Sequence, residues 1–141
     1  MKFLVATDGS EESERAVEHA TTDAVAHDAT LSVVHIVPED PAAATRGATT
    51  EVDLEDRGER VLERARERAE AVADAHGADV SVDTELRSGR PANAIMGYAE
   101  EIDADALFLG HRVVAAQREA VVGSVAKDIL DTATIPVTIV P

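Results

Sequence analysis

One segment of the chain combines the residue types that bind phosphate through the backbone. Gly110-His111-Arg112 is followed further along by Gly123-Ser124, at the start of a helical pattern. Glycine has no Cβ, so its backbone N–H can approach phosphate oxygens, and a serine at a helix N-terminus adds a hydroxyl and a favourable dipole. Arg112 and Arg118 are the cations of this stretch, and either can offset phosphate charge. We therefore predict an anion site here, with His111 as a candidate ligand contact.

A second chemical signal lies near the beginning of the sequence, where Asp8-Gly9 follows an apolar run. The Asp8 carboxylate can accept hydrogen bonds from a ribose or from the edge of a base. Taken alone, Asp8 is more often a turn or capping residue than a ligand contact, Gly110 is a turn glycine, and Gly123-Ser124 is a helix start. The prediction of a site depends on whether the fold brings these segments together.

Short apolar runs bounded by turn residues predict the strands that must position these groups. The third run alternates apolar with polar residues, which indicates a strand with one exposed face near a sheet edge. His35 falls in the second run, where we expect a packing histidine. The expected strands cover 3–7, 31–37, 80–86, 106–109 and 137–140.

Between these runs, the sequence shows helical periodicity with recognisable start and stop residues. Ser10 is placed as an N-cap, Gly77 as a C-terminal stop, and Pro91 in a first turn. The expected helices follow Ser10, cover 51–76 and 92–101, and begin at Gly123-Ser124. The long helix carries an arginine stripe interleaved with glutamates. An anion-binding ridge is one interpretation of this stripe, and a solvated, salt-bridged face is the prediction we favour. The stripe comprises Arg57, Arg60, Arg64 and Arg68.

Strict alternation of strands and helices indicates one α/β domain over 1–141, with a parallel sheet covered on both faces. The expected strand order is 3-2-1-4-5, which places the reversal of strand order between the first and fourth strands. Ligands bind beyond the carboxyl ends of strands at such a point. In this order, Asp8-Gly9 and Gly110-His111-Arg112 face each other.

From Gly110 the chain reads GHRVVAAQREAVVGSV, which resembles the phosphate loop of the universal stress protein family. Thr7-Asp8, Val34-His35-Ile36 and Ile135-Pro136-Val137 also fit the family pattern, so the resemblance covers essentially the whole chain. It departs from the pattern at Val113, where the family's nucleotide-binding branch has glycine. Valine does not easily adopt a positive φ, so the loop must take another course there or lose a phosphate contact.

The resemblance implies a Rossmann-like fold that binds ATP or AMP, with Mg²⁺ bridging the phosphates, and acts as a stress-response sensor. It assigns Asp8 to the ribose or adenine and the backbone of Ile36 to the adenine. It also implies a symmetric dimer in which the strand Val137–Val140 pairs antiparallel with its twofold mate. The nucleotide-binding residues that it implies are Thr7, Asp8, Ile36, Gly110, His111, Arg112, Gly123, Ser124 and Val125.

Composition excludes several classes of partner. The chain has 28 acidic and 13 basic residues, a net charge of −15, and lysine only at positions 2 and 127. A basic footprint for nucleic acid or an anionic membrane surface is missing, so we expect neither partner. Acidic surfaces poor in lysine resemble those of halophilic proteins, and a merely acidic mesophilic protein is the alternative. With no cysteine, no membrane-length apolar run and no signal-peptide pattern, we expect a cytoplasmic protein.

Catalytic motifs are not apparent in the sequence. It has no Gly-Lys-Ser/Thr P-loop, no Gly-x-Ser-x-Gly elbow and no His-Glu-x-x-His pair, so we expect a binding module and predict no catalytic or metal-ligating residue. Two alternatives stay open. One is a family member that binds no nucleotide and acts through dimerisation and protein partners, for which Val113 is the evidence. The other is a weak hydrolase of adenine nucleotides.

Overall fold

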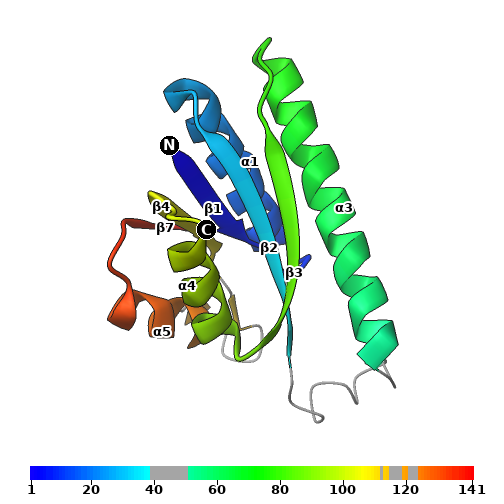
Figure 1. Cartoon of the computed structure of the whole chain (residues 1–141), viewed down its shortest axis with the longest axis vertical. Helices are drawn as coiled ribbons and strands as arrows, with labels where there is room; N and C mark the ends of the chain where they lie inside the picture. Colours follow the sequence, from blue (N-terminus) through cyan, green and yellow to red (C-terminus); the bar gives the residue numbers. More distant parts are fainter. Residues whose placement is uncertain (39–50, 112, 115–118, 121–123) are drawn as a thin grey trace.

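The computed structural model describes residues 1–38, 51–111, 113–114, 119–120 and 124–141. Its centre is a five-stranded sheet in the order β3-β2-β1-β4-β7, in which every neighbouring pair is parallel (Figure 1). The predicted α/β class and the order 3-2-1-4-5 are confirmed. The strands are β1 (Lys2–Ala6), β2 (Thr30–Pro38), β3 (Val82–Gly89), β4 (Ala106–Gly110) and β7 (Val137–Val140).

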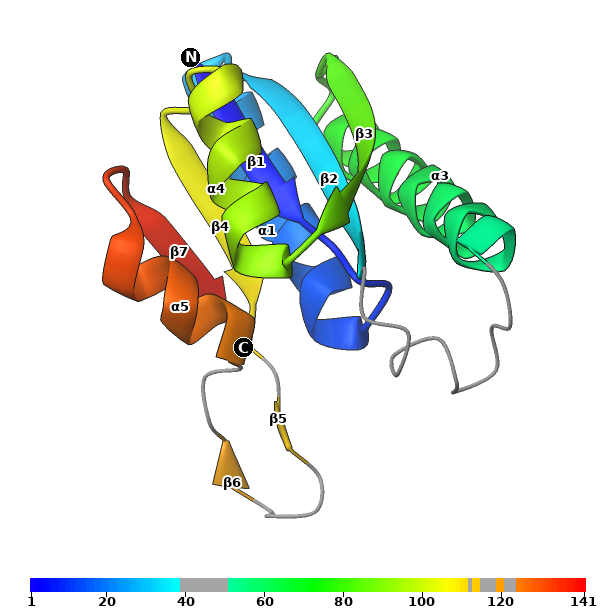
Figure 2. The ribbon, with the colours of Figure 1, turned by 60° about the horizontal axis from the view of Figure 1, so that its bottom comes forward.

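Helices cover both faces of this sheet (Figures 1 and 2). The helices α1 (Glu11–His27) and α3 (Glu51–Ala75) pack on one face, around a core that includes Phe3 and Phe108. The helices α4 (Pro91–Glu101) and α5 (Ser124–Thr132) pack on the other, around Leu4, Leu107 and Ile129. Strands buried on both faces explain why the central runs are continuously apolar rather than alternating.

The helix-start and helix-stop residues lie at the ends of helices, as the sequence predicts. Ser10 caps α1, because its Oγ accepts a hydrogen bond from the backbone N–H of Ser13 at 3.3 Å. Gly77 adopts φ +66° just beyond the end of α3, a conformation that favours glycine over residues with a side chain. Pro91 occupies the first turn of α4. Each of these features depends on residues close in sequence.

Two features of the sheets differ from the expectation. The third strand begins at Val82 and extends to Gly89, because its pairing with β2 continues until Gly89 lies opposite Pro38. It is an edge strand, as predicted. In addition, β5 (Val113–Val114) and β6 (Glu119–Ala120) form an antiparallel pair that the sequence did not indicate. Strands of two residues are too short to produce a readable alternation.

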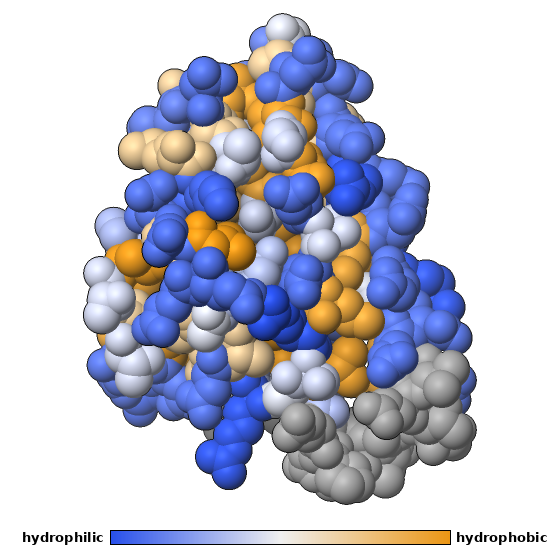
Figure 3. Space-filling model, in the orientation of Figure 1, coloured by the Kyte–Doolittle hydropathy of each residue, from blue (hydrophilic) through white to orange (hydrophobic). Residues whose placement is uncertain are grey.

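On the charged face of α3, Arg68 forms salt bridges to another helix. The Nε atom of Arg68 lies 2.9 Å from Glu14 Oε2 on α1, and the same guanidinium also contacts Glu18. Arg68 is thus salt-bridged, as expected of this stripe, but its partners lie on α1 rather than on α3 itself. Hydrophilic side chains cover the α3 edge of the molecule in Figure 3. None of the helices in the described ranges has the apolar length that crossing a bilayer needs.

Candidate functional site

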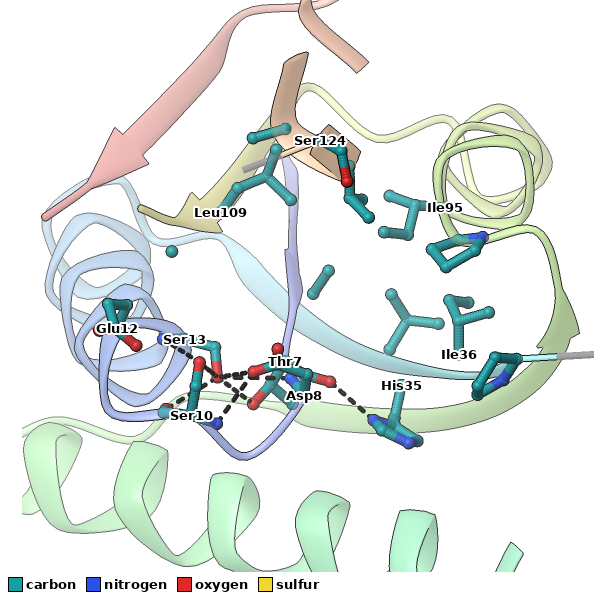
Figure 4. Close-up of a pocket in the computed structure, with 17 residues that line it drawn as sticks. Thr7, Asp8, Ser10, Glu12, Ser13, His35, Ile36, Ile95, Leu109 and Ser124 are labelled. Carbon is teal, nitrogen blue, oxygen red and sulfur yellow. Dashed lines mark hydrogen bonds between the residues drawn. The ribbon is translucent and has the colours of Figure 1, made fainter. Parts of the chain in front are cut away.

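A cavity of about 340 Å³ opens at the carboxyl ends of β1, β2 and β4, where the strand order reverses (Figure 4). This is the position at which open α/β sheets bind ligands. Its volume lies within the range of about 300–1,000 Å³ that is usual for small-molecule sites. The cavity is lined by Ala6, Thr7, Asp8, Ser10, Glu12, Ser13, Val34, His35, Ile36, Pro38, Pro91, Ile95, Leu109, Gly110, Ser124, Val125 and Ala126.

The turn after β1 forms one wall of the cavity and is held by short-range hydrogen bonds. Asp8 Oδ1 accepts from the backbone N–H of Ser10 at 2.9 Å and from the hydroxyl of Ser13 at 3.1 Å. The hydroxyls of Thr7 and Ser13 lie 2.9 Å apart, and Thr7 Oγ1 also accepts from the N–H of Gly9 at 3.2 Å. Thr7 and Ser13 are both buried. The turn is therefore tied to the first turn of α1.

His35 connects the same turn to β2. Its Nδ1 lies 2.8 Å from the carbonyl oxygen of Thr7, and since a carbonyl oxygen only accepts, Nδ1 carries the proton. A Cβ built on Gly58 of α3 would lie 2.8 Å from Cδ2 of this imidazole and 2.6 Å from Leu86 Cδ1. Glycine at position 58 thus lets α3 approach the sheet beside His35. The predicted packing role of His35 holds, although the residue also lines the cavity.

The opposite wall of the cavity is apolar. Ile36 and Ile95 are 9% and 4% exposed and lie across the cavity from Glu12 in Figure 4. Pro38, which ends β2, and Pro91, which begins α4, complete this wall. Apolar side chains on one side and a hydroxyl-rich turn on the other suit a ligand with a flat apolar part and a polar part.

Gly110 is required by its contact with α1. A Cβ at this position would lie 2.6 Å from both the carbonyl carbon of Glu12 and the backbone nitrogen of Ser13. Backbone atoms cannot turn aside as a flexible side chain can, so any side chain at position 110 would push β4 away from the start of α1. The residue predicted to approach phosphate is thus also the one that lets β4 pack against the start of α1.

Six of the nine residues predicted for the site line this cavity. They come from three elements (β2, β4 and α5) and the turn after β1: Thr7, Asp8, Ile36, Gly110, Ser124 and Val125. His111 lies just beyond β4, where its backbone N–H donates to the carbonyl of Val140, and it is not among the lining residues. Arg112 and Gly123 lie outside the described residues. Val113 belongs to β5, so its backbone is extended.

Sequence reasoning missed several lining residues, chiefly Glu12, Ser13, Pro38, Pro91 and Ile95. Two signals point to them in retrospect. Pro38 and Pro91 each stand at or just after the carboxyl end of a strand, the edge at which ligands bind. Ser13 lies three residues after the N-cap, so its side chain faces back towards the turn. Among the described lining residues, the charged ones are Asp8 and Glu12, and both are acidic.

Comparison with known proteins agrees with this arrangement. The family model described as the universal stress protein family matches residues 1–141. The chain belongs to the universal stress protein family. A universal stress protein of Thermus aquaticus is 36% identical over 138 residues, which cover 98% of this chain and 96% of the relative.

Solved structures of the family superpose on the whole chain. The universal stress protein from Archaeoglobus fulgidus is 25% identical with a TM-score of 0.81, over 100% of this chain and 98% of the other. A universal stress protein in complex with cAMP is 26% identical with a TM-score of 0.73, over 100% of this chain and 97% of the other. The family fold therefore extends along the entire sequence.

Proposed function

We propose that this family member binds an adenine nucleotide, ATP or AMP, in the cavity and acts as a sensor or regulatory module in a stress response. The observation that carries the proposal is the pairing of an apolar wall with a hydrogen-bonding turn at the reversal of strand order. Ile36 and Ile95 would contact the faces of adenine. Asp8 would accept from the ribose or the base.

The phosphates would lie towards Gly110 and Ser124. Ser124 is the first residue of α5 and lines the cavity, so the positive end of that helix dipole is available to an anion. The relative in complex with cAMP supports an adenine ring and a phosphate in this family fold.

Mg²⁺ would arrive with the nucleotide rather than bind to the protein alone. In the part of the chain that the structure describes, no cluster of three histidine or acidic side chains is arranged to hold a metal ion. Asp8 and Glu12 offer the hard oxygen ligands that Mg²⁺ prefers, but two carboxylates leave most of an octahedral shell to water and phosphate. When bound, the ion would neutralise phosphate charge beside these acidic residues.

Calorimetric titration of AMP and ATP, with and without MgCl₂ in molar KCl, tests the proposal. Asp8→Ala should weaken AMP binding by about tenfold, because an acceptor for a ligand donor is lost. Asp8→Asn keeps an Oδ1 acceptor for Ser10 and Ser13. It therefore removes the carboxylate charge without removing the hydrogen bonds that hold the turn. Asp74→Ala, an exposed aspartate near the far end of α3, is the matched control. An unmodified protein that binds neither nucleotide would refute the proposal.

A second proposal, suggested by Val113, is that the chain acts through a symmetric dimer across β7. Of the two edge strands, β3 is covered at its first residue, where Arg66 on α3 donates to the carbonyl of Val82 at 2.9 Å. On β7, the carbonyl of Val140 accepts from His111 and that of Pro136 from Leu107, both on the β4 side. Because backbone groups alternate in direction along a strand, the backbone N–H and C=O groups of Val137 and Ile139 face the open edge. Such an edge favours pairing with a second copy.

Ile139→Pro deletes an outward N–H, whereas Thr138→Pro deletes an inward one that pairs with β4. We expect Ile139→Pro to give a folded monomer and Thr138→Pro to destabilise the fold itself. Light scattering in 2 M KCl measures the mass, and circular dichroism measures folding. A monomeric unmodified protein at micromolar concentration would contradict the dimer.

A further inference from the structure

Ser13 is a buried hydroxyl beneath the cavity, with an exposed fraction of 5%. Its Oγ lies 2.9 Å from Thr7 Oγ1, 3.1 Å from Asp8 Oδ1 and 2.9 Å from the carbonyl oxygen of Ser10 (Figure 4). It also accepts from the backbone N–H of Asp8 at 3.3 Å and from the hydroxyl of Ser10 at 3.2 Å. One side chain of α1 therefore contacts three residues of the turn that presents Asp8.

The number of protons limits what this hydroxyl can do. A serine hydroxyl has one proton to donate, and both Asp8 Oδ1 and the Ser10 carbonyl oxygen can only accept. The Thr7 hydroxyl, 2.9 Å away, has a proton of its own and can donate to Ser13 instead of accepting from it. The Ser13 proton then serves either Asp8 Oδ1 or the Ser10 carbonyl oxygen at any one time. Each acceptor has a second donor, since Asp8 Oδ1 accepts from the Ser10 N–H at 2.9 Å and the Ser10 carbonyl from the Glu14 N–H at 3.0 Å. Neither acceptor loses its last hydrogen bond when the proton turns to the other.

We infer that Ser13 is a positioning residue for the nucleotide site, an inference that rests on the proposed function. Ser13 holds the Asp8 carboxylate at the cavity, and its proton turns from Asp8 to the Ser10 carbonyl when a donor of the ligand reaches Asp8. Asp8 thus keeps its orientation without ligand and gains accepting capacity with ligand. Ser13 itself makes no contact with the nucleotide in this scheme and acts through Asp8.

Ser13→Ala tests the inference in the full-length protein, with AMP as the probe. Removing the hydroxyl leaves Asp8 without one of its donors, so we expect AMP affinity to fall by about tenfold in calorimetric titration. The matched control is Thr21→Val. Thr21 is a fully buried hydroxyl on the same helix, and it donates to the Val17 carbonyl at 2.7 Å, away from the turn. Thr21→Val should lower the urea midpoint as Ser13→Ala does and leave AMP affinity within about twofold.

A rescue variant separates positioning from packing. Ser13→Thr keeps the hydroxyl and should recover AMP affinity to within about threefold of the unmodified protein, whatever its stability. If Ser13→Ala does not fold, Ser13→Cys keeps the shape of the side chain, with a larger atom and a weaker donor, and should bind AMP with intermediate affinity. AMP binding by Ser13→Ala equal to that of the unmodified protein would overturn the inference and leave the proposed function intact. Loss of affinity in Thr21→Val as large as in Ser13→Ala would also overturn it. No AMP binding by the unmodified protein would overturn the proposed function, and the inference with it.

Discussion

Gly110→Ala is expected to destabilise the protein through a clash between two backbones. The new Cβ would lie 2.6 Å from Glu12 C and Ser13 N, nearly 1 Å inside ordinary contact. Overpacking of this kind costs about 1–3 kcal/mol, while the lower entropy of an unfolded chain with alanine returns about 0.4–1 kcal/mol. Gly110 has no positive φ, so strain in the backbone conformation adds nothing. We expect a net loss of about 1–2 kcal/mol, and weaker AMP binding because the displaced turn of α1 carries Ser13.

Gly97→Ala is the matched control, because a Cβ on this exposed glycine of α4 meets no atom within 4 Å. In a helix interior the same substitution stabilises by about 0.5–1 kcal/mol. The two variants should therefore shift the urea midpoint in 2 M KCl in opposite directions, with unchanged m-values, and differ in melting temperature by several degrees. Shifts of the same sign, or a Gly110→Ala variant as stable as the unmodified protein, would refute the packing argument.

The remaining predictions concern charge. Raising KCl from about 0.1 M to 2 M should raise the melting temperature substantially, because screening relieves the repulsion of a chain with net charge −15; no change would remove the case for salt adaptation. Glu12→Gln should tighten the binding of Mg²⁺-free ATP more than that of AMP, whereas Glu11→Gln, on the exposed side of the helix, should tighten neither. If Glu12→Gln instead weakens ATP binding, and only when Mg²⁺ is present, Glu12 is a metal ligand. Burial raises the pKa of Tyr98 in the folded protein. Tyr98 should therefore contribute its full share of the free energy of unfolding below about pH 10, the ordinary tyrosine pKa, and that share should be lost as the pH rises past it. Tyr98→Phe should flatten that fall in urea titrations, and an unchanged pH profile would contradict it.

Much of the architecture follows from the sequence alone, because strands, helices and caps depend on residues near one another in the chain. The apolar runs, Ser10 as a cap, Gly77 as a stop and the alternation of elements predicted the α/β class, whereas the strand order was supported by the motifs that it brings together. That order in turn brought Asp8 and Gly110 to the same cavity, as predicted. The extent of β3 escaped prediction, because its end is set by pairing with β2.

The tertiary structure alone decided which neighbours give these residues their roles. The space at Gly110 is limited by backbone atoms of α1, and that at Gly58 by side chains of β2 and β3. Ile95 reaches the cavity only because α4 packs across the sheet, and His35 bonds to Thr7 only because β1 and β2 are adjacent. Local interactions act within a turn or two and leave a periodic trace in the sequence. Contacts between distant segments arise only when the sheet forms, so no spacing of residues records them.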